Sequence, residues 1–240
     1  MVLETAVIIA GGKGTRREEK TEDLPKPMIS VRGTPLIERS IKWLKKNGVK
    51  NIVIGVAYKK EKIMNYLNDG RDLGVNITYT HHDKNGGTED AFKTAIEQSC
   101  IEDENFYAMN GDQITDLQLD GLTNSHLMSG ATATIVTVKL RTNFGIIEID
   151  DQNKITRFQE KNTISDILIN SGIYVFNKDI KNYLQSGNIE ENAFRKLIDE
   201  GKVRSFYYDG TWLTVNDKKE LKSAEEYLRK YNSIINSNLK

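Results

Sequence analysis

The chain has 240 residues, and its 34 basic and 34 acidic side chains give a formal net charge of zero. This balance does not favour binding to nucleic acid or an anionic membrane, so any phosphate site must be local. One cysteine, Cys100, excludes an internal disulfide framework, and we expect it to be buried at a helix end. With neither a signal-peptide pattern nor an apolar run of about 18 residues, the sequence predicts a cytoplasmic protein.

The first half of the chain alternates strand and helix patterns. An apolar, β-branched run over 6–10 stops at Gly11-Gly12, as expected for a strand buried on both faces of a parallel sheet. After Pro35, apolar residues recur at helical spacing as far as Asn47-Gly48. The patterns that follow predict strands over 51–57, 75–80 and 106–109, and helices over 61–67 and 88–98. This alternation is typical of a doubly wound α/β sheet.

The second half has more strand and less helix. Strand patterns cover 132–138, 145–149, 155–158, 169–176 and 203–207, and helical patterns cover 190–199 and 218 to the end. Part of the sheet is therefore predicted to be mixed. No repeat or linker divides the chain, so we expect one domain over residues 1–240.

A glycine-rich loop, Gly11-Gly12-Lys13-Gly14-Thr15-Arg16, follows the first strand, where open parallel sheets bind ligands. Its backbone N–H groups can turn toward phosphate oxygens, and Arg16 can supply a bidentate fork. The run lacks the ending of a P-loop, and Arg17 stands where a dinucleotide-binding motif needs glycine. Two glycines alone would indicate only a tight turn. Farther on, Pro25 and Pro27 hold Lys26 in an extended conformation.

Together, GGKGTR and LPKPM resemble the N-terminal signature of the sugar-phosphate nucleotidyltransferases, or nucleotide-sugar pyrophosphorylases. The resemblance implies a Rossmann-like, mostly parallel mixed sheet flanked by helices. It also implies Mg²⁺-dependent, in-line transfer of a nucleotide from a nucleoside triphosphate to a sugar 1-phosphate, with release of pyrophosphate. The implied catalytic residues are Arg16 on the leaving pyrophosphate, Lys26 on the α-phosphate and Asp112 on the metal.

Two further segments extend the resemblance on the nucleotide side. Residues 86–91 are similar to the LGTAGA segment that reads the nucleobase, although Glu89 and Asp90 depart from it, and Gly111-Asp112 is similar to the GD motif that holds Mg²⁺. The implied nucleotide-binding residues are Ala10, Gly11, Gly12, Gly14, Thr15, Arg16, Lys26, Gly87, Thr88 and Asp112.

On the sugar side, segments around Gly145, Glu160-Lys161 and Asn170-Ser171-Gly172 look like the FG, EK and N-x-G-I-Y segments of the family. The implied sugar-phosphate-binding residues are Gly145, Glu160, Lys161, Asn170 and Gly172. Residues 1–130 are then mainly the nucleotide-binding half, and residues 131–240 mainly the sugar-phosphate-binding half.

The second metal ligand is less direct, because Thr214 stands where many members have a ligating aspartate. Val215-Asn216-Asp217 is instead similar to the variant in N-acetylglucosamine 1-phosphate uridylyltransferases, where an asparagine carbonyl oxygen binds the metal. This resemblance implies Asn216, with Asp217 as the alternative. Trp212 is expected to be a packing residue, and no zinc site is expected.

Two other functions stay open, a cytidylyltransferase for a non-sugar phosphate such as phosphocholine and a non-catalytic nucleotide sensor. The segments around Glu160 and Asn170 argue against the first. The sequence leaves open the nucleobase, the sugar and the oligomeric state, a homodimer included.

Overall fold

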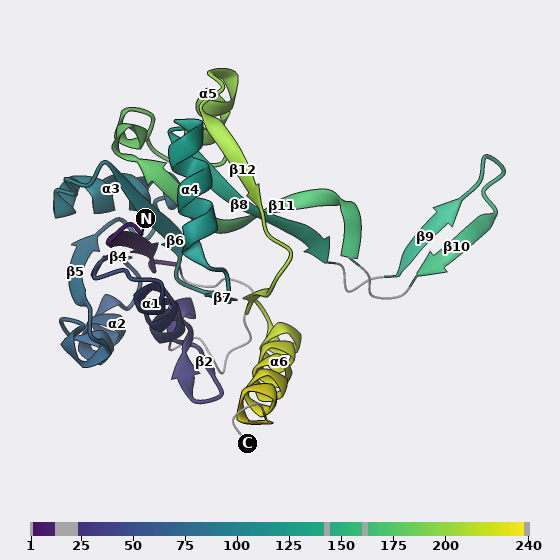
Figure 1. Ribbon diagram of the computed structural model, residues 1–240, viewed down its shortest axis with the longest axis horizontal. Helices are drawn as coiled ribbons and strands as arrows, with labels where there is room; N and C mark the ends of the chain where they lie inside the picture. The colour runs from purple at the N-terminus through teal and green to yellow at the C-terminus, as the bar shows by residue number, and fades with distance from the viewer. Residues whose placement is uncertain (1, 13–23, 142–144, 160–162, 238–240) are drawn as a thin grey trace.

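A computed structural model describes residues 2–12, 24–141, 145–159 and 163–237 of the chain, and a seven-stranded sheet forms its centre (Figure 1). The strand order is β12-β8-β11-β6-β1-β4-β5. These strands are β1 (Thr5–Ile9), β4 (Asn51–Val56), β5 (Asn76–His81), β6 (Asn105–Asn110), β8 (Ala133–Arg141), β11 (Thr163–Asn177) and β12 (Val203–Tyr207).

One strand reverses the direction of the sheet. β1 pairs in parallel with β4 and β6, β4 with β5, and β12 with β8. Long β11 lies antiparallel between β6 and β8, so the other six strands all point the same way. The sheet is therefore mixed but mostly parallel, which confirms the predicted fold class.

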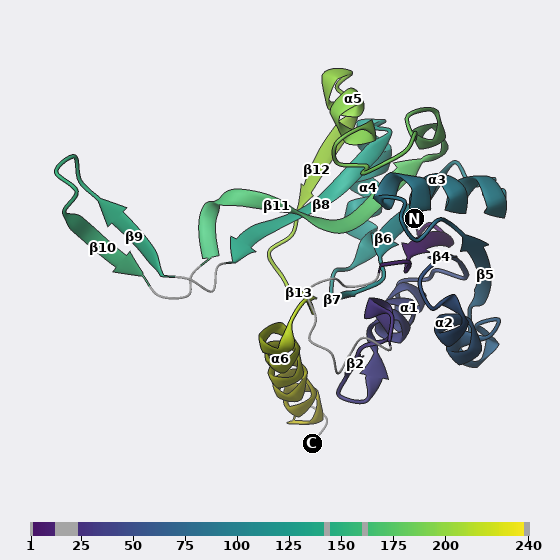
Figure 2. The same cartoon turned by 180° about the vertical axis from the view of Figure 1, so that it is seen from behind.

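Helices cover both faces of the sheet (Figures 1 and 2). One hydrophobic core packs under α1 (Leu36–Lys46), α2 (Lys60–Leu67) and α4 (Leu119–Ser129). The other packs under α3 (Thr88–Ser99) and α5 (Ala193–Asp199). Along β1, Ala6 and Ile8 enter the first core and Val7 enters the second. This alternation buries both faces of the strand, as its apolar run predicts.

Short elements join the two ends of the chain beside the sheet. The hairpin of β2 (Ser30–Val31) and β3 (Thr34–Pro35) follows η2 (Lys26–Met28), and β7 (Gln113–Thr115) pairs with β13 (Trp212–Thr214). Val31, Ile114 and Ala224 belong to a third core that packs α6 (Lys218–Ser237) against these strands. The described residues also form the 3₁₀ helices η3 (Arg71–Leu73) and η4 (Lys178–Asn182).

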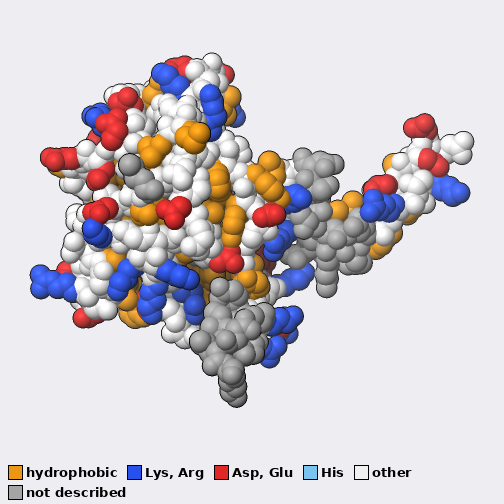
Figure 3. All heavy atoms as spheres, viewed as in Figure 1, with side chains coloured by type: hydrophobic (Ala, Val, Ile, Leu, Met, Phe, Trp, Pro, Cys, Tyr) orange, Lys and Arg blue, Asp and Glu red, His pale blue; other side chains and the backbone are white. Residues whose placement is uncertain are grey.

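A two-stranded hairpin, β9 (Ile146–Ile149) and β10 (Ile155–Gln159), projects away from the sheet body (Figures 1 and 3). Four large apolar side chains of this hairpin are exposed: Ile147, Ile149, Ile155 and Phe158. The sequence correctly predicts both strands, but it carries no signal for their separation from the body.

The structure adds one helix and corrects one local expectation. Helix α4 was not predicted, because Gly121, Thr123 and Asn124 have low helix propensity and weaken its apolar periodicity. Cys100 does end a helix, as the C-cap of α3 with φ 51°, but its side chain is exposed rather than buried.

Within the described residues, no helix combines the length and apolarity needed to cross a membrane.

Candidate active site

Chain direction brings the candidate residues to one edge of the sheet. β1 and β6 end side by side, so Ala10 and Gly11 lie next to Gly111 and Asp112 at their carboxyl ends. Because β11 is antiparallel to β6 and pairs Ile173 with Met109, the residues before Ile173 extend past the end of β6. This edge is where open α/β sheets place their ligands.

Three polar side chains converge at this edge. Lys26 Nζ forms an ion pair with Asp112 Oδ2 and donates a hydrogen bond to Asn216 Oδ1 at 2.6 Å. The side chains of Lys26 and Asp112 are 18% and 19% exposed, so the pair is shielded but still within reach of a ligand. We call Lys26, Asp112 and Asn216 the cation cluster.

Backbone contacts fix the two ends of the cation cluster. Pro25 is extended, with φ −63° and ψ 147°, but Lys26 begins the 3₁₀ helix η2, so the prediction of an extended conformation at Lys26 is wrong. Met28 N donates to Pro25 O at 2.9 Å, and this turn sets the backbone of Lys26. Before Asp112, Gly111 N donates to Ile9 O at 2.9 Å, and a Cβ on Gly111 would lie 3.0 Å from Ile8 Cγ2. This close approach of two strand ends explains the glycine before Asp112.

The alternative metal ligand, Asp217, lies outside the cation cluster. It is exposed, and its Oδ1 accepts a hydrogen bond from Glu220 N at 2.8 Å, which caps the first turn of α6. Asn216, one residue earlier, is the residue that meets Lys26.

The oxygen atoms of the cation cluster suit a hard divalent ion. Asp112 Oδ2 and Asn216 Oδ1 already contact a cation, the Lys26 ammonium. No group of three or more histidine, cysteine or acidic residues that could hold a metal occurs in the described part of the chain. Two protein oxygens fit Mg²⁺, which retains several waters and binds substrate phosphates.

The two glycines after β1 differ in their surroundings. A Cβ on Gly11 would lie 2.1 Å from Nε2 of His82, whereas a Cβ on Gly12 would have no described atom within 4 Å. Burial lowers the pKa of the His82 imidazole that lies against Gly11. His82 follows β5 and belongs to no motif, which is why the sequence did not single it out.

Hydrogen bonds and a close backbone contact join the start of α3 to the loop before α5. A Cβ on Gly87 would lie 1.8 Å from Gly187 O, so only glycine permits this approach. Asp90 Oδ2 accepts hydrogen bonds from Gly187 N at 2.8 Å and from Gly87 N at 3.0 Å. Both bonds lower the pKa of Asp90, and the bond from Gly187 has the larger effect.

The neighbouring side chains hold the same loop. Thr88 Oγ1 donates to Glu190 Oε2 at 3.1 Å. Glu89 is fully buried and accepts from Gln185 N at 2.9 Å and Asn192 Nδ2 at 2.7 Å. The Glu89-Asp90 pair, which departs from the family pattern, therefore has a structural role in this chain.

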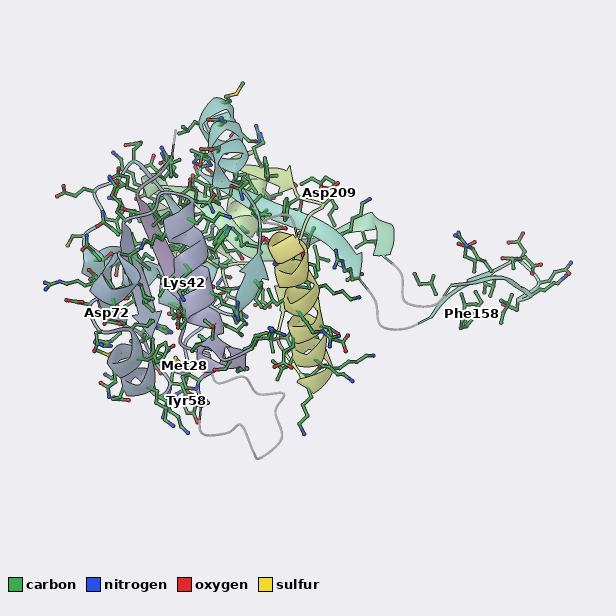
Figure 4. The ribbon with its side chains drawn as sticks, turned by 60° about the horizontal axis from the view of Figure 1, so that its bottom comes forward. Met28, Lys42, Tyr58, Asp72, Phe158 and Asp209 are labelled. Atoms are coloured by element: carbon green, nitrogen blue, oxygen red, sulfur yellow. The ribbon has the colours of Figure 1, made fainter. Side chains whose placement is uncertain are left out.

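On the sugar side, the predicted residues are not all brought together. Gly172 has φ 75°, and its N–H donates to Asn170 Oδ1 at 2.8 Å, while Asn170 Nδ2 donates to Tyr174 Oη at 2.9 Å. Gly145 lies in the projecting hairpin, beside the Phe158 ring. Figure 4 shows Phe158 far from Met28, which is two residues after Lys26.

Five predicted site residues lie outside the described residues: Gly14, Thr15, Arg16, Glu160 and Lys161. Their roles stay predictions.

Residues 5–230 match the Nucleotidyl transferase family. The chain is 34% identical over 215 residues to a UTP–glucose-1-phosphate uridylyltransferase from Synechocystis, covering 82% of this chain and 55% of that protein. It is 31% identical over 217 residues to a D-glycero-alpha-D-manno-heptose 1-phosphate guanylyltransferase from Campylobacter jejuni. That alignment covers 88% of this chain and 93% of the guanylyltransferase. The chain thus spans about half of the first relative and most of the second.

A solved structure of HddC from Yersinia pseudotuberculosis has the same fold. The TM-score between the two is 0.72 and the sequence identity is 24%. The alignment covers 94% of this chain and 100% of the HddC chain.

Proposed function

The chain belongs to the Nucleotidyl transferase family, and we propose that it joins a nucleoside triphosphate to a sugar 1-phosphate, forming a nucleoside diphosphate sugar and pyrophosphate. The observation that carries the proposal is the cation cluster. Lys26 and Asn216 are separated by 190 residues, yet both meet at the carboxyl edge of the sheet beside Asp112. Catalysis of this kind depends on positioning and on neutralising phosphate charge, for which such a cluster is suited.

Each member of the cluster has a proposed role. Asp112 and Asn216 would hold Mg²⁺, which when bound would neutralise charge on the phosphates. The Lys26 ammonium would bind the α-phosphate, whose phosphorus is attacked by the sugar 1-phosphate oxygen. In-line attack by that oxygen requires no protein nucleophile.

The remaining nucleotide contacts are proposed around the cluster. Backbone groups of Ala10, Gly11 and Gly12 would face the nucleotide, and the lack of any described atom within 4 Å of a Cβ on Gly12 supports this role. Gly87 and Thr88 would face the nucleobase. The loop residues Gly14, Thr15 and Arg16 would bind the triphosphate, with Arg16 on the leaving pyrophosphate.

The sugar 1-phosphate would bind on the side of β11. Asn170 and Gly172 shape the chain where β11 passes the end of β6, which supports a pocket there. Gly145, Glu160 and Lys161 would complete it. Residues 1–240 would form one domain with halves at 1–130 and 131–240, because strands of both halves belong to one seven-stranded sheet, in which β11 of the second half pairs with β6 of the first.

Cytoplasmic location and a homodimer, as the oligomeric option, belong to the same proposal. A cytidylyltransferase for a non-sugar phosphate and a nucleotide sensor are the competing functions.

The test is pyrophosphate release with Mg²⁺ across the common nucleoside triphosphates and a panel of sugar 1-phosphates. We expect release in one or a few combinations and its loss in Asp112→Ala. Asp217→Ala is the matched control, because it removes a nearby carboxylate that lies outside the cation cluster. If no combination releases pyrophosphate although calorimetry shows triphosphate binding, the proposal is contradicted and one of the two competing functions is favoured.

A further inference from the structure

We propose that Glu220 is a positioning residue that fixes the side-chain amide of Asn216 with its oxygen toward the cation site. The inference rests on the proposed function, since it assigns Asn216 Oδ1 as a metal ligand. Glu220 lies in the first turn of α6 and belongs to none of the recognised motifs.

The carboxylate of Glu220 gathers three donors around one oxygen. Glu220 Oε2 accepts from Asn216 N at 2.7 Å, from Asn216 Nδ2 at 3.0 Å and from Thr214 Oγ1 at 3.2 Å. Asn216 Nδ2 also donates to Thr214 Oγ1 at 3.1 Å. The amide nitrogen thus faces Glu220 and Thr214, while Asn216 Oδ1 faces Lys26 Nζ at 2.6 Å.

The chemistry of the neighbours selects this orientation. An asparagine amide has nearly the same shape when it is turned by half a rotation, so packing alone does not choose between its oxygen and its nitrogen. A carboxylate only accepts and an ammonium only donates. Turning Asn216 over would set its oxygen against Glu220 and its NH₂ group against Lys26, with unfavourable contacts on both sides.

Thr214 completes the arrangement at the position where the resemblance leads one to expect an aspartate. Its hydroxyl donates a hydrogen bond to Glu220 and accepts one from Asn216. An aspartate carboxylate at this position could accept from Asn216 but could not donate to Glu220. The threonine at 214 and the asparagine at 216 therefore act as a pair, in which Thr214 helps to orient a neutral ligand.

The test is a Mn²⁺ titration of the full chain, followed by water-proton relaxation. Glu220→Met removes the acceptor, and we expect Mn²⁺ affinity to fall by about 10-fold to 100-fold, the usual effect of losing a group that orients a metal ligand. Glu220→Gln, which retains an acceptor oxygen, should recover most of the affinity. Thr214→Val should weaken binding in the same direction by a smaller factor.

The decisive comparison repeats Glu220→Met in an Asn216→Asp background. Aspartate presents an oxygen in either orientation, so removing Glu220 should no longer weaken Mn²⁺ binding. If Glu220 only stabilised the start of α6, the loss would be equal in both backgrounds, and that result would overturn the inference. Asp217→Ala, which removes the other cap of this turn, should leave Mn²⁺ affinity unchanged.

Failure of the proposed function gives a different pattern. If Asp112→Ala binds Mn²⁺ as tightly as the wild-type chain, the metal site itself is wrong, and the inference fails with it. If Asp112→Ala loses Mn²⁺ binding while Glu220→Met does not, the metal site stands and the role of Glu220 is rejected.

Discussion

The sheet body and the β9–β10 hairpin hold their residues by different means. In the body, β1 and β6 bury most of their side chains, and close contacts at Gly11, Gly87 and Gly111 set the positions of the site residues. The hairpin has no comparable core, since Phe158 is 59% exposed and Ile149 is 58% exposed.

Local bonds maintain the hairpin instead. Asp150 Oδ1 accepts from Gln152 N and Lys154 N, both at 2.9 Å, and Arg157 pairs with Glu148 at 3.0 Å. An isolated two-stranded hairpin is marginally stable in water. The comparison teaches that the body can hold a reacting geometry by itself, whereas residues on the hairpin, such as Gly145, depend on what the hairpin contacts.

The same substitution in the two regions gives the largest expected contrast. Phe176 in β11 is fully buried among aromatic rings, including Phe92 at a centroid distance of 5.6 Å. Phe176→Ala should lower the free energy of unfolding by about 3–5 kcal/mol, because it leaves a cavity. Phe158→Ala should change it by less than about 0.5 kcal/mol. Urea denaturation measures both, and equal losses would show that the hairpin packs on the body in solution.

Within the body, Lys26→Met should separate charge neutralisation from metal binding. Turnover should fall by about 10²-fold to 10³-fold, as expected when one charge-stabilising donor is lost. Mn²⁺ binding to the nucleotide-free chain should become tighter, because the ammonium no longer competes for Asp112 and Asn216.

Lys42→Met is the matched control for this variant. Lys42 is 58% exposed and pairs with Glu38 on α1, so both readouts should stay at wild-type values. Weaker Mn²⁺ binding in Lys26→Met would contradict the assignment of its two partners as metal ligands.

Gly12→Ala tests whether the edge of the body receives phosphate. The added methyl group meets no described atom, so stability should be unchanged, while triphosphate affinity should fall by about 2 kcal/mol through lost charge-assisted hydrogen bonds. Gly11→Ala places the same methyl group against His82 and should also lower the melting temperature. Calorimetric binding and thermal unfolding separate the two variants, and unaltered affinity in Gly12→Ala would place the phosphates elsewhere.

A smaller effect concerns His126, which joins strands of both halves of the body. Its Nδ1 bonds Thr134 Oγ1 at 2.8 Å and its Nε2 bonds Asn105 Oδ1 at 3.0 Å. Burial lowers the pKa of His126 from 6.5 to about 4, so the folded chain resists protonation that the unfolded chain accepts.

The resulting stability contribution is complete above about pH 6.5 and is lost as pH falls toward 4. His126→Gln should flatten the decline of unfolding free energy over this window, as measured by denaturation at a series of pH values. An unchanged slope would show that other groups cause the decline.

Local patterns in the sequence predicted much of the body. The apolar run of β1, the exact bounds of β12 and the alternation of strand and helix follow from side-chain periodicity, which depends on near neighbours. Lys26 and Asp112 were identified because each lies in a compact motif.

Long-range pairing was beyond such patterns. The reversed direction of β11, which brings Asn170 to Gly172 past the end of β6, depends on contacts between distant strands. The meeting of Lys26 with Asn216 and the buried bonds of Glu89 are similarly long-range. Glu220 was missed because its role depends on three donors at one oxygen, and periodicity does not encode that.

The central claim is nucleotidyl transfer at the edge of the body, and ³¹P NMR of one reaction mixture tests it most directly. With Mg²⁺, the triphosphate and the sugar 1-phosphate from a productive combination, nucleoside diphosphate sugar and pyrophosphate should appear in equal amounts, and neither should form when either substrate is omitted. Pyrophosphate that forms without the sugar 1-phosphate would show hydrolysis rather than transfer and would contradict the account.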